Sequence, residues 1–183
     1  MVIISFLAIS TRGQNPIGIP DIINYTRDHY NAGSQNRGIV QDRNGIMYFA
    51  NYEGLLTFDG TYWKLYPLPH RTVVRSLAIG ADNRIYVGSQ ADFGYFAPGA
   101  NGKLVYTSLV PQIPGKRKIF SEVWETVSFG KDVFFCSREY IFRFSNNLIN
   151  AYPAKSSWQF LGQSHQRLIA QDINAGLLEF SGG

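Results

Sequence analysis

Four times along the chain, a short apolar run ends in a small residue, passes through a polar loop and restarts on an aromatic-rich run. The restarts at Gly54, Gly94, Tyr140 and Gly176 are 40, 46 and 36 residues apart. An internal repeat constrains a fold more than any local motif, because each unit must bury its apolar face against the next. A period near 40 residues, built from strand-length runs, is typical of propeller blades rather than of helical solenoids.

Each copy divides into as many as four short strands, separated by turns rich in Gly, Asn and Pro. The 13 Phe, 11 Tyr and 3 Trp support this reading, because aromatic side chains fit a pleated, half-buried surface. Successive copies are predicted to have strands at 38–41, 46–50, 55–58 and 62–66; at 75–79, 84–88, 94–97 and 103–109; at 123–129, 133–136, 140–144 and 148–152; and at 158–161, 167–170 and 177–180.

The sequence therefore predicts an all-β fold, a β-propeller of about three and a half four-stranded blades. Three and a half blades cannot close a typical ring of seven. They would leave strand edges and an apolar blade face exposed, so we expect this chain to supply only part of a ring. The chain is then the N-terminal part of a longer protein or a truncated gene product. The predicted segments are a leader at 14–35 with a closing strand at 22–25, blades at 36–72, 73–114 and 119–157, and a partial fourth blade at 158–183.

The first nine residues are almost wholly apolar. This run is too short for a membrane span of about 20 residues and fits the core of a signal peptide. Thr11 and Gly13 are small enough to precede a cleavage site, so residues 1–13 are predicted to be a signal peptide and Gln14 the first mature residue. Export would place the chain on the periplasmic side of the inner membrane. The alternative for this segment is a buried first strand.

No motif in the chain indicates catalysis, a metal or a cofactor. The three histidines, His29, His70 and His165, lie in unrelated loops without zinc-site spacing. The turn at 42–45 lacks the remaining ligands of a calcium loop, and no G-x-S-x-G or phosphate-binding Gly loop is present. The net charge of +4 is mild, and its one dense basic run, 116–118, lies in a predicted loop. We therefore expect no direct contact with nucleic acid.

The single cysteine, Cys136, occupies the position filled by Ala50, Gly88 and Ala170 in the other copies. Because this position takes small residues, Cys136 is predicted to be a buried core thiol rather than a nucleophile.

Residues 36–60 resemble the repeat of the two-component regulator propeller family. That repeat has a D-x-x-G turn, an aromatic-rich strand, a polar loop and then G-L-x-x-F/Y-D, matched here at 42–45, 46–50, 51–53 and 54–59. A second copy at 74–96 carries Asn83 in place of the turn Gly. Residues 15–25 resemble the start of the mature region in triple-tyrosine-motif regulators of this family.

This resemblance implies a parent protein with an exported propeller sensor, an immunoglobulin-like triple-tyrosine domain, a membrane helix and a cytoplasmic output. The output implied is a LuxR-type helix-turn-helix or a histidine kinase. The 183 residues contain no H-box, ATP-binding motif or recognition helix, so neither kinase nor DNA-binding activity is predicted for this chain.

In a propeller, the loops that join second to third strands gather on one face. Mixed polar, charged and aromatic groups on such a face suit a small molecule or a glycan. We therefore predict a ligand-binding face formed by Asn51, Tyr52, Glu53, Gln90, Asp92, Phe93, Arg138, Glu139, Asp172 and Asn174. The other expected partners are the remaining blades, the downstream domains and a second copy in a homodimer.

The leading hypothesis is thus a non-enzymatic sensor module that binds a ligand outside the cytoplasm. The first alternative is an exported propeller enzyme, such as a lyase or a quinoprotein-like dehydrogenase, which would need a cluster of His, Glu or Arg in the channel. The second is a plain interaction scaffold without a defined pocket.

Overall fold

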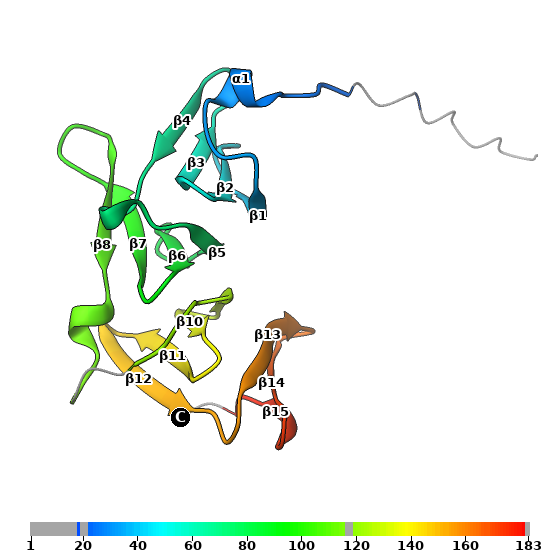
Figure 1. Cartoon of the computed structure of the whole chain (residues 1–183), viewed down its shortest axis with the longest axis vertical. Coiled ribbons are helices and arrows are strands. Elements are labelled where there is room, and N and C mark those ends of the chain that lie inside the picture. The colour runs from blue at the N-terminus through cyan, green and yellow to red at the C-terminus, as the bar shows by residue number, and fades with distance from the viewer. Residues whose placement is uncertain (1–17, 19–21, 116–118, 182–183) are drawn as a thin grey trace, which may run out of the picture.

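The structure is a computed structural model that describes residue 18 and residues 22–115 and 119–181 (Figure 1). The predicted signal peptide, residues 14–17 and 19–21 of the leader and the basic run at 116–118 lie outside these residues. The described chain contains strands β1 to β15, one short helix, α1 (Arg27–Tyr30), and two single 3₁₀ turns, Pro69–Arg71 and Val110–Gln112. The predicted all-β fold is confirmed.

The strands form four antiparallel sheets, each following chain order. Sheet one contains β1 (Asn36–Gln41), β2 (Met47–Asn51), β3 (Gly54–Phe58) and β4 (Trp63–Tyr66). Sheet two contains β5 (Val74–Ile79), β6 (Ile85–Ser89), β7 (Phe93–Pro98) and β8 (Leu104–Ser108). Sheet three contains β9 (Glu125–Phe129), β10 (Asp132–Cys136), β11 (Tyr140–Ser145) and β12 (Leu148–Pro153). Sheet four has three strands, β13 (Trp158–Ser164), β14 (Arg167–Asp172) and β15 (Gly176–Glu179).

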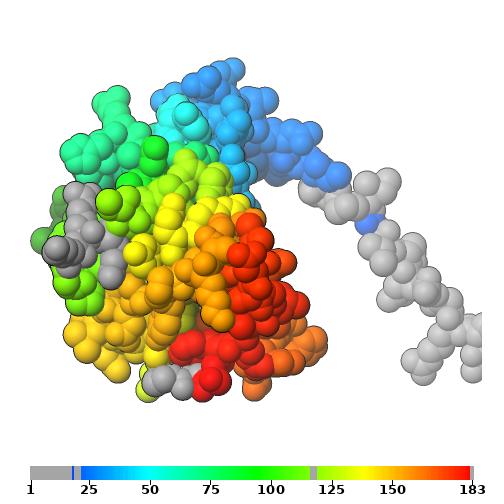
Figure 2. Space-filling view, turned by 60° about the horizontal axis from the view of Figure 1, so that its bottom comes forward, coloured from blue at the N-terminus to red at the C-terminus, as the bar shows by residue number. Residues whose placement is uncertain are grey.

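The sheets follow one another around an arc, with the first strand of each sheet toward the inside (Figure 1). These innermost strands make contact in order: β1 packs beside β5, β5 beside β9, and β9 beside β13. The space-filling view shows the later sheets, yellow to red, packed into one continuous body (Figure 2). Successive four-stranded meanders around a common axis define a β-propeller, so the predicted architecture is confirmed.

The hydrophobic core lies in the seams between sheets. Buried side chains form one cluster between sheets one and two, a second between sheets two and three, and a third between sheets three and four. The second seam is aromatic: the ring centroid of Phe93 lies 4.5 Å from that of Phe135 and 4.9 Å from that of Phe142. All three rings are fully buried. Each sheet therefore depends on its neighbours for a core.

The structure places no strand at residues 22–25, where the sequence predicts a closing strand. This segment instead runs into α1. The ring centroid of Tyr25 lies 5.2 Å from that of Phe58 and 5.3 Å from that of Trp63. Tyr30 of α1 contacts the same indole at 5.6 Å. The leader thus covers an aromatic surface of sheet one with side chains, without pairing its backbone to a strand. The predicted partner, the last blade of a closed ring, is not among the described sheets.

A carboxylate organises the turn between the first and second strands in sheets one and two. In sheet one, Asp42 Oδ1 accepts the N–H groups of Asn44 and Ile46, and Asp42 Oδ2 accepts the hydroxyl of Tyr48 at 3.1 Å. Burial and this hydrogen bond raise the pKa of Tyr48 to about 12. In sheet two, Asn83 adopts φ +61°, corresponding to φ +84° at Gly45. Asn tolerates this left-handed conformation better than most residues, which explains the substitution in the second copy.

In the four described sheets, a buried polar residue ends the second strand or directly follows it, and caps the loop that comes next. Asn51 Oδ1 accepts the N–H of Glu53, Ser89 Oγ donates to the carbonyl O of Asp92, and Ser137 Oγ accepts the N–H groups of Glu139 and Tyr140. Asp172 Oδ1 accepts the N–H groups of Asn174 and Ala175. Each cap adds side-chain hydrogen bonds to the backbone of the tight loop that follows it.

The small residue predicted in each copy lies directly before this cap in the first three sheets, as Ala50, Gly88 and Cys136. A Cβ atom at Gly88 would lie 2.4 Å from Val123 Cγ1 in the segment entering sheet three, so the next sheet restricts the position to small residues. In sheet four the corresponding residue is the exposed Gln171, one place after the predicted Ala170. The predicted alignment at Ala170 is therefore wrong by one residue, because Asp172 pairs with Gly176 and caps the loop, as Asn51 pairs with Gly54 in sheet one.

We expect Phe93→Ala to lower the free energy of unfolding by about 3–5 kcal/mol, because it removes a fully buried ring from the aromatic seam. Urea denaturation followed by tryptophan fluorescence measures the change. Val105→Ala on β8, where the side chain is 54% exposed, is the matched control and should change stability by less than about 0.5 kcal/mol. Similar losses in both variants would contradict a core located in the seams.

We expect Asp172→Asn to make stability less sensitive to acid. Burial favours the neutral carboxyl, but hydrogen bonds from Ser156, Asn174 and Ala175 outweigh it and hold the pKa of Asp172 below its usual range. A lowered folded-state pKa adds stability above the unfolded value of about 3.9 that is lost as pH falls below it. The test is to measure the urea denaturation midpoints of the wild type and the variant at about four pH values between pH 6 and pH 2. Parallel curves for both proteins would contradict it.

Candidate functional site

One end of the sheets, which we call the loop face, carries two kinds of segment. These are the loops between second and third strands and the connections that enter the next sheet. Backbone hydrogen bonds tie them together: the N–H of Ala91 donates to the carbonyl O of Ser121 at 2.6 Å, and the N–H of Trp158 donates to that of Arg138 at 2.9 Å. The ten residues predicted to bind a ligand all lie on or directly beside this face.

Three of these residues are turned inward and are fully buried: Asn51, Phe93 and Asp172. Asn51 Nδ2 also donates to the carbonyl O of Gly33 at 2.6 Å, and its Oδ1 accepts the N–H of Gly33 at 3.1 Å. Asp172 accepts both the N–H and the hydroxyl of Ser156. These side chains shape the loop face and hold its connections, while Phe93 belongs to the aromatic seam.

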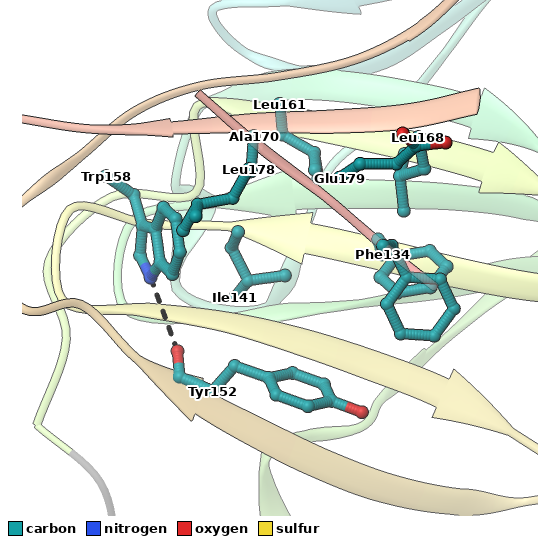
Figure 3. A pocket seen from close by; sticks show the side chains of 10 residues that line it. Phe134, Ile141, Tyr152, Trp158, Leu161, Leu168, Ala170, Leu178 and Glu179 are labelled. Carbon is teal, nitrogen blue, oxygen red and sulfur yellow. Dashed lines mark hydrogen bonds between the residues drawn. The ribbon is translucent and has the colours of Figure 1, made fainter. Parts of the chain in front are cut away.

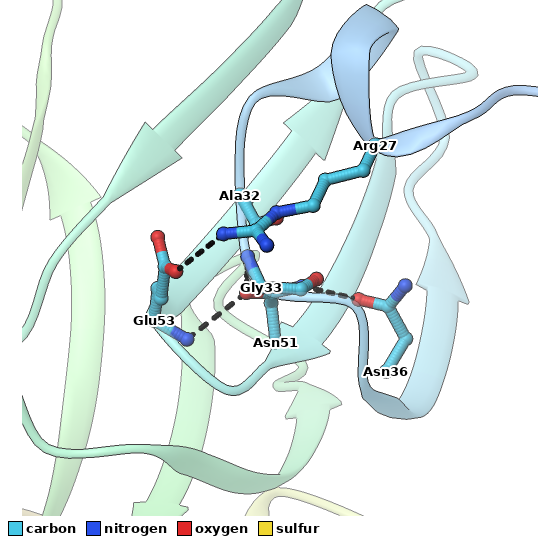
Figure 4. Close-up of polar contacts among 6 residues, drawn as sticks. All are labelled: Arg27, Ala32, Gly33, Asn36, Asn51 and Glu53. Carbon is cyan, nitrogen blue, oxygen red and sulfur yellow. Dashed lines mark hydrogen bonds and ion pairs between the residues drawn. The ribbon is translucent and has the colours of Figure 1, made fainter.

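Tyr52 and Glu53 follow Asn51 and reach solvent. Tyr52 is 55% exposed, and Glu53 pairs with Arg27 of α1 at 3.7 Å. Figure 4 shows how Arg27, Gly33 and Asn51 converge on this loop. Arg27, Tyr52 and Glu53, together with residues 33–35, line a shallow hollow of about 350 Å³. This part of the loop face combines an aromatic ring, a carboxylate and a guanidinium within one depression.

Gln90 and Asp92 line a second, larger hollow of about 580 Å³, together with His70 and Ser108. The hydroxyl of Ser108 donates to Asp92 Oδ1 at 2.5 Å. Gln90 is exposed and forms an isolated β-bridge with Glu122. The structure therefore places these two predicted residues in a concave setting that mixes polar and apolar side chains.

Arg138 and Glu139 are half-buried and join neighbouring segments. Arg138 Nη1 donates to the carbonyl O of Trp158 at 2.9 Å. Glu139 Oε1 accepts the hydroxyl of Ser121 at 3.0 Å, and Oε2 accepts the N–H of Ser121 at 3.2 Å. Burial opposes ionisation of Glu139, but these bonds hold its pKa below the usual range. Asn174 is exposed at the loop of sheet four.

Sequence reasoning missed a group of side chains at the loop-face ends of the innermost strands, the axial cluster, comprising Arg37, Arg75, Glu122 and Trp124. The guanidinium carbons of Arg37 and Arg75 lie 5.6 Å and 5.1 Å from the centroid of the Trp124 indole. Arg75 Nη2 also pairs with Glu122 Oε1 at 2.7 Å. The four residues come from three separate repeats. The one sequence feature that they share is a position within, or just before, the first strand of a repeat.

An apolar cavity of about 130 Å³ lies between sheets three and four (Figure 3). Phe134, Ile141 and Leu168 are among the side chains that line it, and Trp158 Nε1 donates to the carbonyl O of Tyr152 at 3.3 Å beside it. Since these groups belong to the third hydrophobic cluster, we assign the cavity to the seam.

Within the described residues, no three His, Cys, Asp or Glu side chains gather as a metal site would require. Cys136 is buried, and burial raises the pKa of its thiol, which opposes the nucleophilic thiolate form. The described part of the chain also contains no helix that is long and apolar enough to cross a membrane.

No protein-family model and no curated protein sequence matches the chain. Its fold, however, matches solved structures. One is the extracellular domain of BT4673 from B. thetaiotaomicron, assigned to a one-component system, with a TM-score of 0.62, 11% identity and coverage of 84% of this chain. Another is the extracellular domain of the BT3049 hybrid two-component system of the same organism, with a TM-score of 0.58, 12% identity and 79% coverage.

The chain spans only 22% and 23% of those two structures. It is also similar to virginiamycin B lyase from Staphylococcus aureus, with a TM-score of 0.57, 15% identity and coverage of 81% of this chain and 57% of the lyase. These similarities demonstrate the fold. At that level, the chain is a β-propeller segment similar to the extracellular propellers of sensor proteins, as its repeats predicted.

Proposed function

We propose that the chain is an extracytoplasmic, ligand-sensing propeller segment of a bacterial signal-transduction protein and is not itself catalytic. The observation that carries this proposal is the fold match, over about four-fifths of the chain, to extracellular domains of two sensor proteins. The parent protein would add further blades, a membrane helix and either a helix-turn-helix or a histidine kinase as output.

The ligand is a small molecule or a glycan that binds the loop face. The support is the distribution of exposed groups: Tyr52 and Glu53 in one hollow, Gln90 and Asp92 in another, and Asn174 beyond them. Aromatic and polar side chains that converge on concave surfaces suit such ligands. The buried caps beneath them keep the loops in place without contacting the ligand.

We expect a saccharide and metabolite panel, screened by thermal shift, to yield a ligand whose affinity Tyr52→Ala lowers about tenfold when remeasured by calorimetry. The loss would reflect removal of the exposed ring at the first hollow. Tyr62→Ala is the matched control, because Tyr62 is 74% exposed in the β3–β4 turn at the opposite end of sheet one. Equal affinities for Tyr52→Ala and wild type would contradict binding at this hollow.

We expect the chain, expressed with its own N-terminus in a Gram-negative host, to appear in the periplasm and to begin at Gln14. Intact-mass spectrometry of the periplasmic fraction measures the cleavage site. Retention in the cytoplasm with residues 1–13 attached would contradict export.

The lyase similarity provides a second candidate, an exported propeller enzyme. We rank it second because the axial cluster, although it contains Arg37, Arg75 and Glu122, includes no histidine, and its carboxylate is held in an ion pair with Arg75. Incubation with virginiamycin B should leave that compound intact by mass spectrometry. Turnover that His70→Ala abolishes would favour the enzyme instead.

A further inference from the structure

We propose that the axial cluster of Arg37, Arg75, Glu122 and Trp124 binds the anionic group of an acidic saccharide, with Arg37 as its principal contact. This inference rests on the proposed sensing function and names the ligand class. The anionic group is a carboxylate or a sulfate, since each can present two acceptor oxygens to the paired N–H donors of a guanidinium.

A β-bulge in the first strand of each of sheets one and two places an arginine in the cluster. Sheet pairing shifts register between Asn36 and Ile39 in β1 and between Val74 and Ser76 in β5. The extra residues at these bulges include Arg37 and Arg75. A β-bulge re-aims a side chain away from the regular alternation of a strand, and such bulges concentrate beside functional sites. Both guanidinium groups are thereby brought to the indole of Trp124, directly before β9.

The charges within the cluster do not cancel. Arg75 and Glu122 neutralise each other at 2.7 Å, and their side chains are only 14% and 20% exposed. Arg37 is exposed, and no acidic side chain among the described residues forms an ion pair with it. The cluster therefore carries one uncompensated positive charge, located on its solvent-facing member.

Hydrogen-bonding capacity also remains unused. Arg75 Nε is buried without a partner among the described residues. A guanidinium offers five donors in a fixed fork, and contact with an aromatic ring holds that fork in place. Arg37 beside Trp124 is thus a pre-positioned donor for the paired oxygens of a carboxylate or sulfate.

The surroundings favour a hydroxylated ligand over a bare anion. Gln90 is exposed and joined to Glu122 by a β-bridge, which places an amide next to the cluster. Trp124 remains partly exposed at the edge of the cluster, but the guanidinium groups of Arg37 and Arg75 already lie over its ring. The exposed cation and the neighbouring Gln90 together match a sugar that carries an acidic substituent.

The test is calorimetric titration of the full chain with three probes: trigalacturonate, a carrageenan tetrasaccharide that carries sulfate only, and maltotriose. At least one anionic probe should bind, and more weakly as salt rises, because screening acts on an exposed charge. Arg37→Gln should lower its affinity about tenfold or more. Arg84→Gln is the matched control: Arg84 stacks on Tyr95 at 4.3 Å and pairs with Asp82, but lies at the opposite end of sheet two.

Loss of binding in Arg37→Gln with retention in Arg84→Gln supports the proposal, and the two anionic probes identify the group recognised. Failure of both anionic probes, or an equal loss in the two variants, would overturn it. Binding of maltotriose alone would also overturn it, yet would support the proposed sensing function. The two hypotheses can therefore fail separately.

Discussion

Contact between the facing surfaces of successive sheets is the interaction on which the rest of this structure depends. An isolated four-stranded sheet here has apolar side chains on its faces and no core of its own. The packed rings of Phe93, Phe135 and Phe142 join sheets two and three, and comparable clusters join the other pairs. The same requirement explains why the leader places Tyr25 and Tyr30 against Trp63 on sheet one.

This dependence divides the chain into parts with different roles. Strands and their capping residues fix the positions of the loops, and the exposed loop residues are then free to differ in chemistry. Asn51 and Asp172 illustrate the first role, because each satisfies several polar groups while fully buried. Tyr52 and Asn174, within two residues of them, illustrate the second.

The strands could be predicted because each repeat presents short apolar runs between turn residues, and those signals are local. The prediction of β10 at 133–136, for example, differs from the observed Asp132–Cys136 by one residue. The binding face was less accessible to sequence reasoning. A loop Asn or Asp looks the same whether it faces a ligand or caps a backbone, and only tertiary packing decides which. The axial cluster depends on bulges and on contacts between separate repeats, neither of which the local pattern of Arg37 or Arg75 reveals.

The hydrogen bonds between each loop and the entry to the next sheet have a mechanical consequence. Ala91 and Ser89 are bonded to Ser121 and Val123, and Arg138 is bonded to Trp158. The loops of sheets two and three are thus coupled in series around the rim, each anchored to its successor. Because these hydrogen bonds join backbone to backbone, we expect a displacement of one loop to displace the entry to the adjacent sheet as well.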